Sequence, residues 1–513
     1  MKRFTLSVAV VIACGAFVLA QDSGQVLRVS VGYGTMKNTP SVMAKLTPEA
    51  RAEVDRLGEV ARAANSEGKY GDALKHLFHA LALMREAEWT PGRALASALT
   101  VKLDRAMLDP GDTVAIRIGQ MFSLDEKLSG KLNGTVSLLK LRGDDTVKEL
   151  KSLDSLDPDF IAHPFSTEVV TPDVETGNYR IAVQFKRVGG DPIMKYVTVH
   201  IERGLAKQFA EARARAMKIE ASLEAKHQDG LVAAVPSAEY RILLFELARA
   251  SEINFDRIDF REALKEASSM LDALGAGNDA FAARRGEFKK AYRSKVDNTL
   301  QPYQVFLPTA YDKSKPTPLV IVLHGMGGDE NGYFQAYGQG AFKVEAEKRA
   351  YIVACPKGRK PASMYIGDAE KDVLDVIAEM RRDYNIDPDR IYLTGHSMGG
   401  FGTWSVAMSH PDVFAAIAPI SGGSNTPAGM SKIAHIPEIV VHGDNDRTVP
   451  VERSRVMVEM GKKLGIEIKY IEVPGGDHGS VVAPTFKDVF DWFDTHRRKS
   501  AEAKAAAAAA KSN

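Results

Sequence analysis

The sequence predicts an α/β fold for residues 301–498, a mostly parallel sheet with helices on both faces. Three observations support this prediction. Strand and helix patterns alternate along the whole segment. The run Pro318–Leu323 is continuously apolar, as a strand buried on both faces should be. Several of the strand patterns are followed directly by polar loops, and such sheets build their sites at the carboxyl ends of their strands.

The elements of this segment follow from their apolar spacing. We expect strands at 318–323, 351–355, 391–394, 414–420, 436–441 and 466–473. We expect helices at 369–384, 400–408 and 484–496. Helices of this length between short apolar strands are the usual connections of a parallel sheet.

Helical segments are expected before the sheet. Residues 21–45 are polar and weakly patterned, which predicts a linker. Residues 46–93 have helical spacing, and 67–83 resemble the middle of a tetratricopeptide repeat. Since one such unit is found and stable arrays need about three, a helical hairpin is favoured over a peptide-binding array. Residues 204–300 again have helical patterns.

A small β-sandwich is expected at residues 94–203. Strand patterns occur at 98–103, 113–118, 134–139, 178–185 and 196–201. Turn sequences such as Asp109-Pro110-Gly111-Asp112 separate them. The segment 168–181 resembles the end of an immunoglobulin-like module, a resemblance that carries no catalytic motif.

The two ends of the chain differ from the rest. Lys2-Arg3 precede an apolar run that ends before Ala20, which predicts a secretory signal over residues 1–20. A lipoprotein anchored at Cys14 is the alternative, because Val11–Cys14 resembles a lipobox. The run is short for a membrane span. The tail 499–513 is rich in Ala and Lys and is expected to be solvated.

Composition excludes some classes of partner. The formal net charge is +1, which argues against nucleic acid or anionic lipid as a main partner. Once residues 1–20 are removed, Cys355 is the one cysteine left, so no internal disulfide can form. It lies in a strand-like run and is expected to be a buried, inert thiol.

A serine lies at a tight turn between a predicted strand and a predicted helix. The sequence Gly395-His396-Ser397-Met398-Gly399 joins a strand to a helix. The pentapeptide alone is a weak signal, but a G-x-S-x-G turn between strand and helix raises the serine hydroxyl toward the first amides of the helix. Ser397 is therefore a candidate nucleophile.

Serine chemistry also needs a base, an acid that orients the base, and donors for an oxyanion. Two later loops supply the first two, in the order acid then base. Asp444 and Asp446 follow one predicted strand, and His478 follows the next. Spacing alone does not choose between the two aspartates.

The motifs of this region are similar to those of a known family. They are LHGMGGDE, RIYLTGHSMGGFGTW, FAAIAPISGG, HGDNDRTVP and GGDHG. Together they resemble the secreted carboxylesterase group of the α/β-hydrolases, which includes feruloyl and acetylxylan esterases and polyhydroxybutyrate-depolymerase-like esterases. The group is related to predicted peptidases of the prolyl-oligopeptidase type. The resemblance covers about two-fifths of the chain and does not extend to residues 21–300.

This resemblance implies roles for single residues. Ser397 would be the nucleophile, His478 the general base and Asp446, the second aspartate of HGDNDRTVP, the acid. The oxyanion donors would be the backbone N–H groups of Met398, after the nucleophile, and Met326, in the loop after an early strand.

Other residues near these loops have less specific roles. Phe334, Tyr337 and Tyr365 are candidates to line the substrate pocket, with packing as the alternative. His324, His396 and His442 are expected to be hydrogen-bonded supporting residues. A metal site built from His442, Asp444, Asp446 and His478 fits no metal signature, so no metal and no cofactor are expected.

The sequence thus predicts a secreted or periplasmic serine hydrolase that cleaves carboxylic esters through an acyl-enzyme. Esters linked to plant polysaccharides and polyesters are candidate substrates, and no membrane span is expected. A serine peptidase of the prolyl-oligopeptidase type is one alternative, since only the leaving group differs. A non-catalytic carbohydrate- or partner-binding protein on a hydrolase scaffold is another. Residues 301–498 are expected to fold alone.

Overall fold

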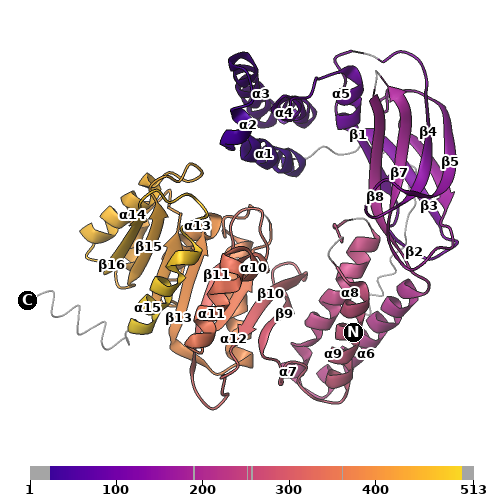
Figure 1. The fold of residues 1–513 in the computed structure, drawn as a ribbon. Helices are drawn as coiled ribbons and strands as arrows, with labels where there is room; N and C mark the ends of the chain where they lie inside the picture. Colours follow the sequence, from indigo (N-terminus) through magenta and orange to yellow (C-terminus); the bar gives the residue numbers. More distant parts are fainter. Residues whose placement is uncertain are drawn as a thin grey trace, which may run out of the picture. The chain divides into compact units, whose positions relative to one another are not determined.

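The computed structural model describes residues 23–498, apart from 127, 189–190, 251, 256–257 and 361. The signal peptide predicted for residues 1–20, the alternative lipid anchor at Cys14 and the tail 499–513 lie outside the described residues. The chain forms two compact units. The first unit consists of the chain up to Phe209 together with Leu244–Ile258 (Figure 1). The second unit consists of Ala210–Leu243 together with the chain from Asp259.

The first unit begins with helices. They are α1 (Ser23–Lys37), α2 (Pro40–Met43), α3 (Pro48–Ser66), α4 (Tyr70–Met84) and α5 (Pro91–Ala98). The prediction of a linker over 21–45 is wrong for its described part. Val26 and Tyr33 lie seven residues apart on one face of α1 and are buried, and the Tyr33 hydroxyl donates to the Val54 carbonyl at 3.1 Å. These two buried contacts were too few to give a visible sequence pattern.

Two sheets follow in the same unit, and all of their strand pairs except β2 with β8 are antiparallel. The three-stranded sheet has the order β1-β3-β6 and the five-stranded sheet the order β2-β8-β7-β4-β5. The strands are β1 (Leu99–Leu103), β2 (Met107–Leu108), β3 (Thr113–Gln120), β4 (Leu132–Lys140), β5 (Thr146–Leu156), β6 (Phe165–Val170), β7 (Gly177–Val188) and β8 (Asp191–Ile201). Sequence patterns missed β2, β5 and β6. β5 is mostly exposed, so it lacks the apolar alternation that marks a strand covered on one face.

The second unit contains an eight-stranded sheet of order β16-β15-β14-β13-β11-β12-β10-β9. The six strands from β11 to β16 are parallel, and β9 and β10 form an antiparallel edge. Its strands are β9 (Gly286–Arg293), β10 (Leu300–Leu307), β11 (Thr317–Leu323), β12 (Ile352–Pro356), β13 (Ile386–His396), β14 (Ala416–Ile420), β15 (Glu438–Gly443) and β16 (Ile468–Val473). The predicted α/β fold class is confirmed.

The helices α6 to α9 precede this sheet in the chain, and the helices α10 to α15 lie between or after its strands. They are α6 (Leu205–Ala225), α7 (Asp229–Val232), α8 (Val235–Arg249), α9 (Phe260–Gly275), α10 (Gly332–Ala336), α11 (Ala341–Lys348), α12 (Asp368–Asp383), α13 (Met398–Ser409), α14 (Glu452–Lys463) and α15 (Phe486–Thr495), with short 3₁₀ turns at 338–340, 427–433 and 483–485. Within the described residues, no helix has the length and apolarity to cross a membrane.

The expected boundary between a helical segment 204–300 and a sheet starting at 301 is wrong. β9 lies before it and pairs with β10 along its whole length. The sequence of β9 hides this strand, because Lys289 and Lys290 interrupt its apolar pattern. Both ammonium groups are paired, with Glu330 and Asp383 respectively. A fragment starting at 301 would therefore lose this edge strand, and β10, which pairs with β12 on its other side, would become an exposed edge. The expectation that residues 301–498 fold alone stays a prediction.

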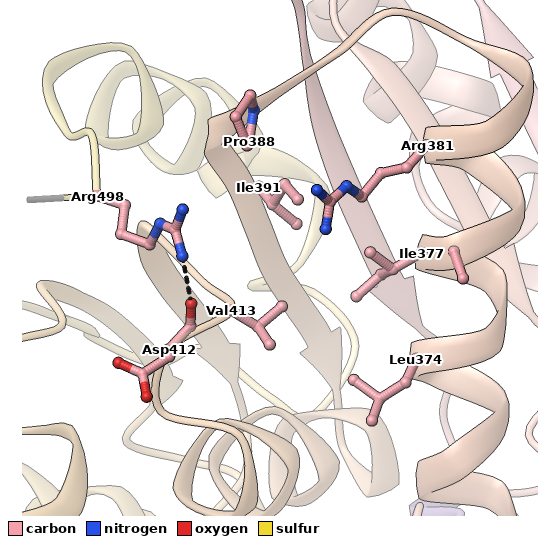
Figure 2. A pocket seen from close by; sticks show the side chains of 9 residues that line it. Leu374, Ile377, Arg381, Pro388, Ile391, Asp412, Val413 and Arg498 are labelled. Atoms are coloured by element: carbon pink, nitrogen blue, oxygen red, sulfur yellow. Dashed lines mark hydrogen bonds between the residues drawn. The ribbon is translucent and has the colours of Figure 1, made fainter. Parts of the chain in front are cut away.

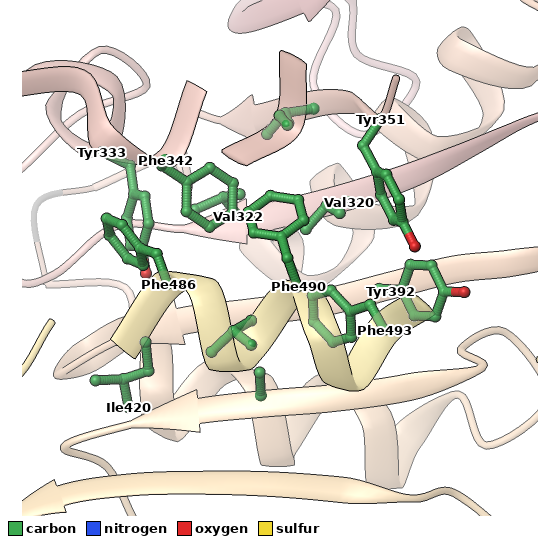
Figure 3. Close-up of a cluster of buried hydrophobic side chains, with 14 of the residues drawn as sticks. Val320, Val322, Tyr333, Phe342, Tyr351, Tyr392, Ile420, Phe486, Phe490 and Phe493 are labelled. Atoms are coloured by element: carbon green, nitrogen blue, oxygen red, sulfur yellow. The ribbon is translucent and has the colours of Figure 1, made fainter. Parts of the chain in front are cut away.

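Residues of α10, α11 and α15 pack against one face of this sheet. Phe486, Phe490 and Phe493 project from α15 onto Val320 and Val322 of β11 and their neighbours (Figure 3). Because side chains alternate along a strand, Leu319, Ile321 and Leu323 face the other side, where α12 and α13 lie. This double cover explains the uninterrupted apolar run of β11.

A carboxyl group is buried at the beginning of β15. Glu438 is 0% exposed, and its Oε2 accepts a hydrogen bond from Trp404 Nε1 at 3.0 Å. Its Oε1 has no hydrogen-bond partner among the described residues. Burial raises the pKa of Glu438 to about 8, although the hydrogen bond from Trp404 lowers it. The folded protein therefore keeps this group protonated at neutral pH.

This raised pKa predicts that stability falls as pH rises. Between the unfolded-state pKa of 4.5 and about 8, the unfolded chain releases a proton that the folded protein keeps. Glu438→Gln should remove this dependence, with little change in Tm at pH 5 and a rise of roughly 5 °C at pH 8. Thermal unfolding at both pH values measures it, with the exposed Glu459→Gln as control. Equal effects at the two pH values would contradict the assignment.

Candidate active site

The turn between β13 and α13 is held in a strained conformation. Ser397 has φ 59° and ψ −119°, in the left-handed half of backbone space that a residue with a side chain rarely adopts. Glycines on either side permit close approach to neighbouring strands. A Cβ on Gly399 would lie 1.9 Å from the carbonyl oxygen of Leu323, and one on Gly400 would lie 2.5 Å from that of Ile420. Ser397 is thereby fixed at the carboxyl end of the sheet.

Three predicted residues from three loops are brought together there. His478 Nε2 lies 2.9 Å from Ser397 Oγ, and His478 Nδ1 lies 2.7 Å from Asp446 Oδ2. The Asp446 side chain is fully buried, whereas 22% of the His478 side chain is exposed. This is an unbroken hydrogen-bonded chain from a buried carboxylate to a partly accessible serine.

The structure distinguishes the two aspartates. Asp446 Oδ1 accepts hydrogen bonds from the amides of Thr448 and Val449, at 2.8 and 2.9 Å. Asp444 is exposed, and its Oδ1 accepts from the Gly475 amide at 2.6 Å. Asp444 thus holds the loop that precedes His478, while Asp446 contacts the His478 ring itself.

Asp446 is kept ionised by its hydrogen bonds. Burial raises its pKa, but hydrogen bonds from His478 and from the two backbone amides outweigh burial, so the pKa lies below its usual range. A carboxylate in this position accepts a hydrogen bond from the Nδ1–H of His478, which leaves Nε2 free to accept a proton from the serine.

His442 supports the same carboxylate. Its Nε2 lies 2.9 Å from the Val449 carbonyl and 3.3 Å from Asp446 Oδ2, and its Nδ1 lies 2.7 Å from Ser454 Oγ. Since carbonyl and carboxylate oxygens only accept, Nε2 carries the hydrogen. Burial lowers the pKa of His442, which keeps the ring neutral. The expectation of a supporting role fits this geometry, but no sequence signal pointed to Ser454.

The two amides predicted as oxyanion donors lie beside Ser397. Met398 follows it directly, and Gly325, next to Met326, is close enough that an added Cβ would lie 3.6 Å from Ser397 Cβ. Neither the Met326 nor the Met398 N–H has an acceptor within the described part of the chain. The Met326 side chain is 50% exposed, while that of Met398 is buried.

Two of the three residues expected to line a substrate pocket are buried in the core. Phe334 and Tyr365 are 1% and 0% exposed, so both pack in the core and that expectation is wrong for them. Their aromatic character marks buried volume here, not a binding surface. Tyr337 is half-buried, and its hydroxyl lies 2.7 Å from His396 Nδ1. Ile366, beside Tyr365, is 64% exposed and was not singled out by sequence.

The remaining predictions concern metals and the thiol. No group of three or more His, Cys, Asp or Glu side chains within the described residues could hold a metal ion. Cys355 is fully buried, and burial raises the pKa of its thiol. His324 Nε2 lies 2.8 Å from the Lys357 carbonyl.

A separate cavity of about 230 Å³ lies near the amino end of β13, whereas Ser397 follows the carboxyl end of that strand (Figure 2). It is lined by Leu374, Ile377, Ala378, Arg381, Pro388, Ile391, Asp412, Val413 and Arg498. Ile391 precedes Ser397 by six residues of extended strand, about 20 Å. The cavity is therefore not part of the serine site.

Residues 298–463 match the family described as "Putative esterase". The match includes Ser397 and Asp446 and ends before His478. The chain is 36% identical over 134 residues to "Bifunctional acetylxylan esterase/xylanase XynS20E" of Neocallimastix patriciarum, covering 25% of this chain and 19% of that protein. The chain is 28% identical over 190 residues to "Probable feruloyl esterase C" of Aspergillus oryzae, covering 35% of this chain and 68% of that protein.

A third relative is "Poly(3-hydroxyalkanoate) depolymerase C" of Paucimonas lemoignei, 33% identical over 118 residues, 21% of this chain and 28% of that protein. Among solved structures, "Crystal Structure of a Thermostable Esterase" matches with TM-score 0.38 and 18% identity, over 78% of this chain and all of that one. The family match and these relatives confirm the resemblance of this region to α/β-hydrolase carboxylesterases.

The geometry predicts unequal roles for the two aspartates. Asp446→Asn should lower kcat by roughly 10³-fold or more, because the amide cannot hold the His478 tautomer that the carboxylate selects. Asp444→Asn should retain activity within about threefold, since the asparagine oxygen can still accept from Gly475. Steady-state hydrolysis of an aryl acetate compares them. Equal losses, or a larger loss for Asp444→Asn, would show that Asp446 is not the orienting acid.

Proposed function

We propose that this protein is a serine hydrolase that cleaves carboxylic esters, with Ser397 as nucleophile, His478 as general base and Asp446 as the orienting acid. The observation that carries the proposal is the continuous hydrogen-bonded chain from Asp446 through His478 to Ser397. It lies at a strained turn beside two amides without acceptors among the described residues. The match of 298–463 to an esterase family supports the same reaction class.

In the proposed reaction Ser397 Oγ attacks the ester carbonyl carbon as His478 Nε2 takes its proton. The carbonyl oxygen becomes an oxyanion and accepts hydrogen bonds from the Met326 and Met398 amides. The C–O bond to the alcohol then breaks, and His478 gives its proton to the leaving oxygen. A water molecule attacks the acyl-enzyme by the same route, returning the acid and a free serine.

The substrates we propose are esters linked to plant polysaccharides, with polyesters as the next class. The relatives are named as acetylxylan, feruloyl and poly(3-hydroxyalkanoate) hydrolases, which supports this choice. These names favour an oxygen leaving group over the amine that a peptidase releases. Such substrates are extracellular polymers, and secretion is part of the proposal on the basis of the N-terminal sequence.

Ser397→Ala should lower kcat for p-nitrophenyl acetate by roughly 10³-fold or more, because no other group supplies the nucleophile. Ser405→Ala, on the same helix α13, is the matched control and should stay near wild type. Circular dichroism checks that both variants fold. Retention of a tenth of wild-type turnover by Ser397→Ala would contradict the assignment.

The substrate class is tested separately with methyl ferulate, acetylated xylan, poly(3-hydroxybutyrate) and a proline p-nitroanilide. We expect Ser397-dependent release from at least one of the first three and none from the anilide. Turnover of the anilide alone would favour a peptidase. An intact fold with no hydrolysis of any ester would favour a binding protein.

A further inference from the structure

The residue before the nucleophile connects two other segments of the site. His396 ends β13 and is 5% exposed. Its Nε2 lies 2.7 Å from the backbone carbonyl oxygen of His478, and its Nδ1 lies 2.7 Å from the Tyr337 hydroxyl. The imidazole thus joins the segment after α10 to the loop that carries the proposed base.

The donors and acceptors in this arrangement follow from its chemistry. The His478 carbonyl oxygen can only accept, so His396 Nε2 carries the hydrogen. In the neutral ring Nδ1 is then a bare acceptor, and the Tyr337 hydroxyl donates to it. Burial and the nearby His478 lower the pKa of His396 to about 4, and burial raises the pKa of Tyr337 to about 12. Both groups are therefore neutral across the physiological range.

Before His478, the loop is tied to the Asp444 loop by the bonds Gly475 N–H to Asp444 Oδ1 at 2.6 Å and Asn445 N–H to the Gly476 carbonyl at 3.0 Å. From residue 477 to 480 the contacts are mostly local. Asp477, Gly479 and Ser480 are exposed, and the hydrogen bonds of Asp477 run to its own neighbours Gly479 and Ser480. Among the described residues, His396 is the one donor to the His478 carbonyl. The His396 and His478 rings also lie 4.6 Å apart between centroids.

Tyr337 in turn is held by packing. Its ring lies 5.3 Å from that of His396 and 5.0 Å from that of Tyr333, both edge-on. Tyr333 is 1% exposed and belongs to the aromatic cluster under α15. The donor to the His478 carbonyl, His396, is therefore packed against Tyr337, which contacts the buried aromatic cluster.

We propose that His396 is a positioning residue that fixes the main chain of His478, with Tyr337 selecting the tautomer that makes this possible. The proposal rests on the proposed function, because it concerns the loop that bears the base. It assigns a role to the side chain of the second residue in the G-x-S-x-G turn. Without the bond from Nε2, the loop would be free to move the His478 ring away from Ser397 Oγ.

Three variants test this role by kinetics. His396→Leu removes the donor and should lower kcat on p-nitrophenyl acetate by about 10–100-fold, with KM changed less than about threefold. His396→Gln places an amide N–H the same number of bonds from Cα as Nε2 and should recover most of the loss. Tyr337→Phe, which leaves His396 free to change tautomer, should lower kcat by less than His396→Leu.

Equal kcat for the Leu and Gln variants, or wild-type kcat for His396→Leu, would overturn the proposal. A change confined to Tm, with kcat intact, would show a packing role only. If the wild type has no Ser397-dependent esterase activity, the proposed function fails instead. The positioning role is then decided by ¹⁵N spectra of the histidine rings. They should show His396 protonated at Nε2 and His478 ring shifts disturbed in His396→Leu but not in His396→Gln; undisturbed shifts in both would refute it.

Discussion

The site depends on backbone-to-backbone contact at the serine turn. Gly399 touches the end of β11 and Gly400 touches the end of β14, at distances that no side chain would permit. The Ser397 amide donates to the Ile420 carbonyl at 2.9 Å, which ties the turn to the same strand. These contacts stabilise a serine conformation that costs of order 1–3 kcal/mol in an unconstrained chain. The strain is therefore maintained by the sheet, and the hydroxyl projects at its carboxyl edge.

Two neutral histidines contact residues of the proposed triad. His442 contacts Asp446, and His396 contacts the main chain of His478. Burial lowers the pKa of both, so neither adds a positive charge that would compete with His478 for the Asp446 carboxylate. The site thus holds one fully buried carboxylate, Asp446, against the His478 ring. That arrangement is what the proposed role of His478 as general base requires.

Sequence reasoning was most accurate where local pattern and fold agree. The apolar run of β11 and the glycines around Ser397 identify the sheet and the turn, because burial on both faces and close backbone approach each restrict residue type. The sequence did not predict α1, because only two of its residues are buried. It did not predict β9 either, because the lysines of this strand are paired with carboxylates that are distant in sequence. For Tyr365 and Phe334 the sequence leaves pocket lining and core packing open, because an aromatic residue near a loop has the same sequence signature in both places. The hydrogen bond from His396 to His478 joins residues 82 positions apart, which no local pattern reveals.

The central claim is that one serine, activated by Asp446 and His478, forms the covalent acyl-enzyme. Incubation with a fluorophosphonate, followed by tryptic peptide mass spectrometry, tests it most directly. We expect a single adduct on Ser397 in the peptide 391–432, and strongly reduced labelling when His478 is replaced by alanine. Labelling of another serine, or labelling of Ser397 that is unaffected by the loss of His478, would contradict the account.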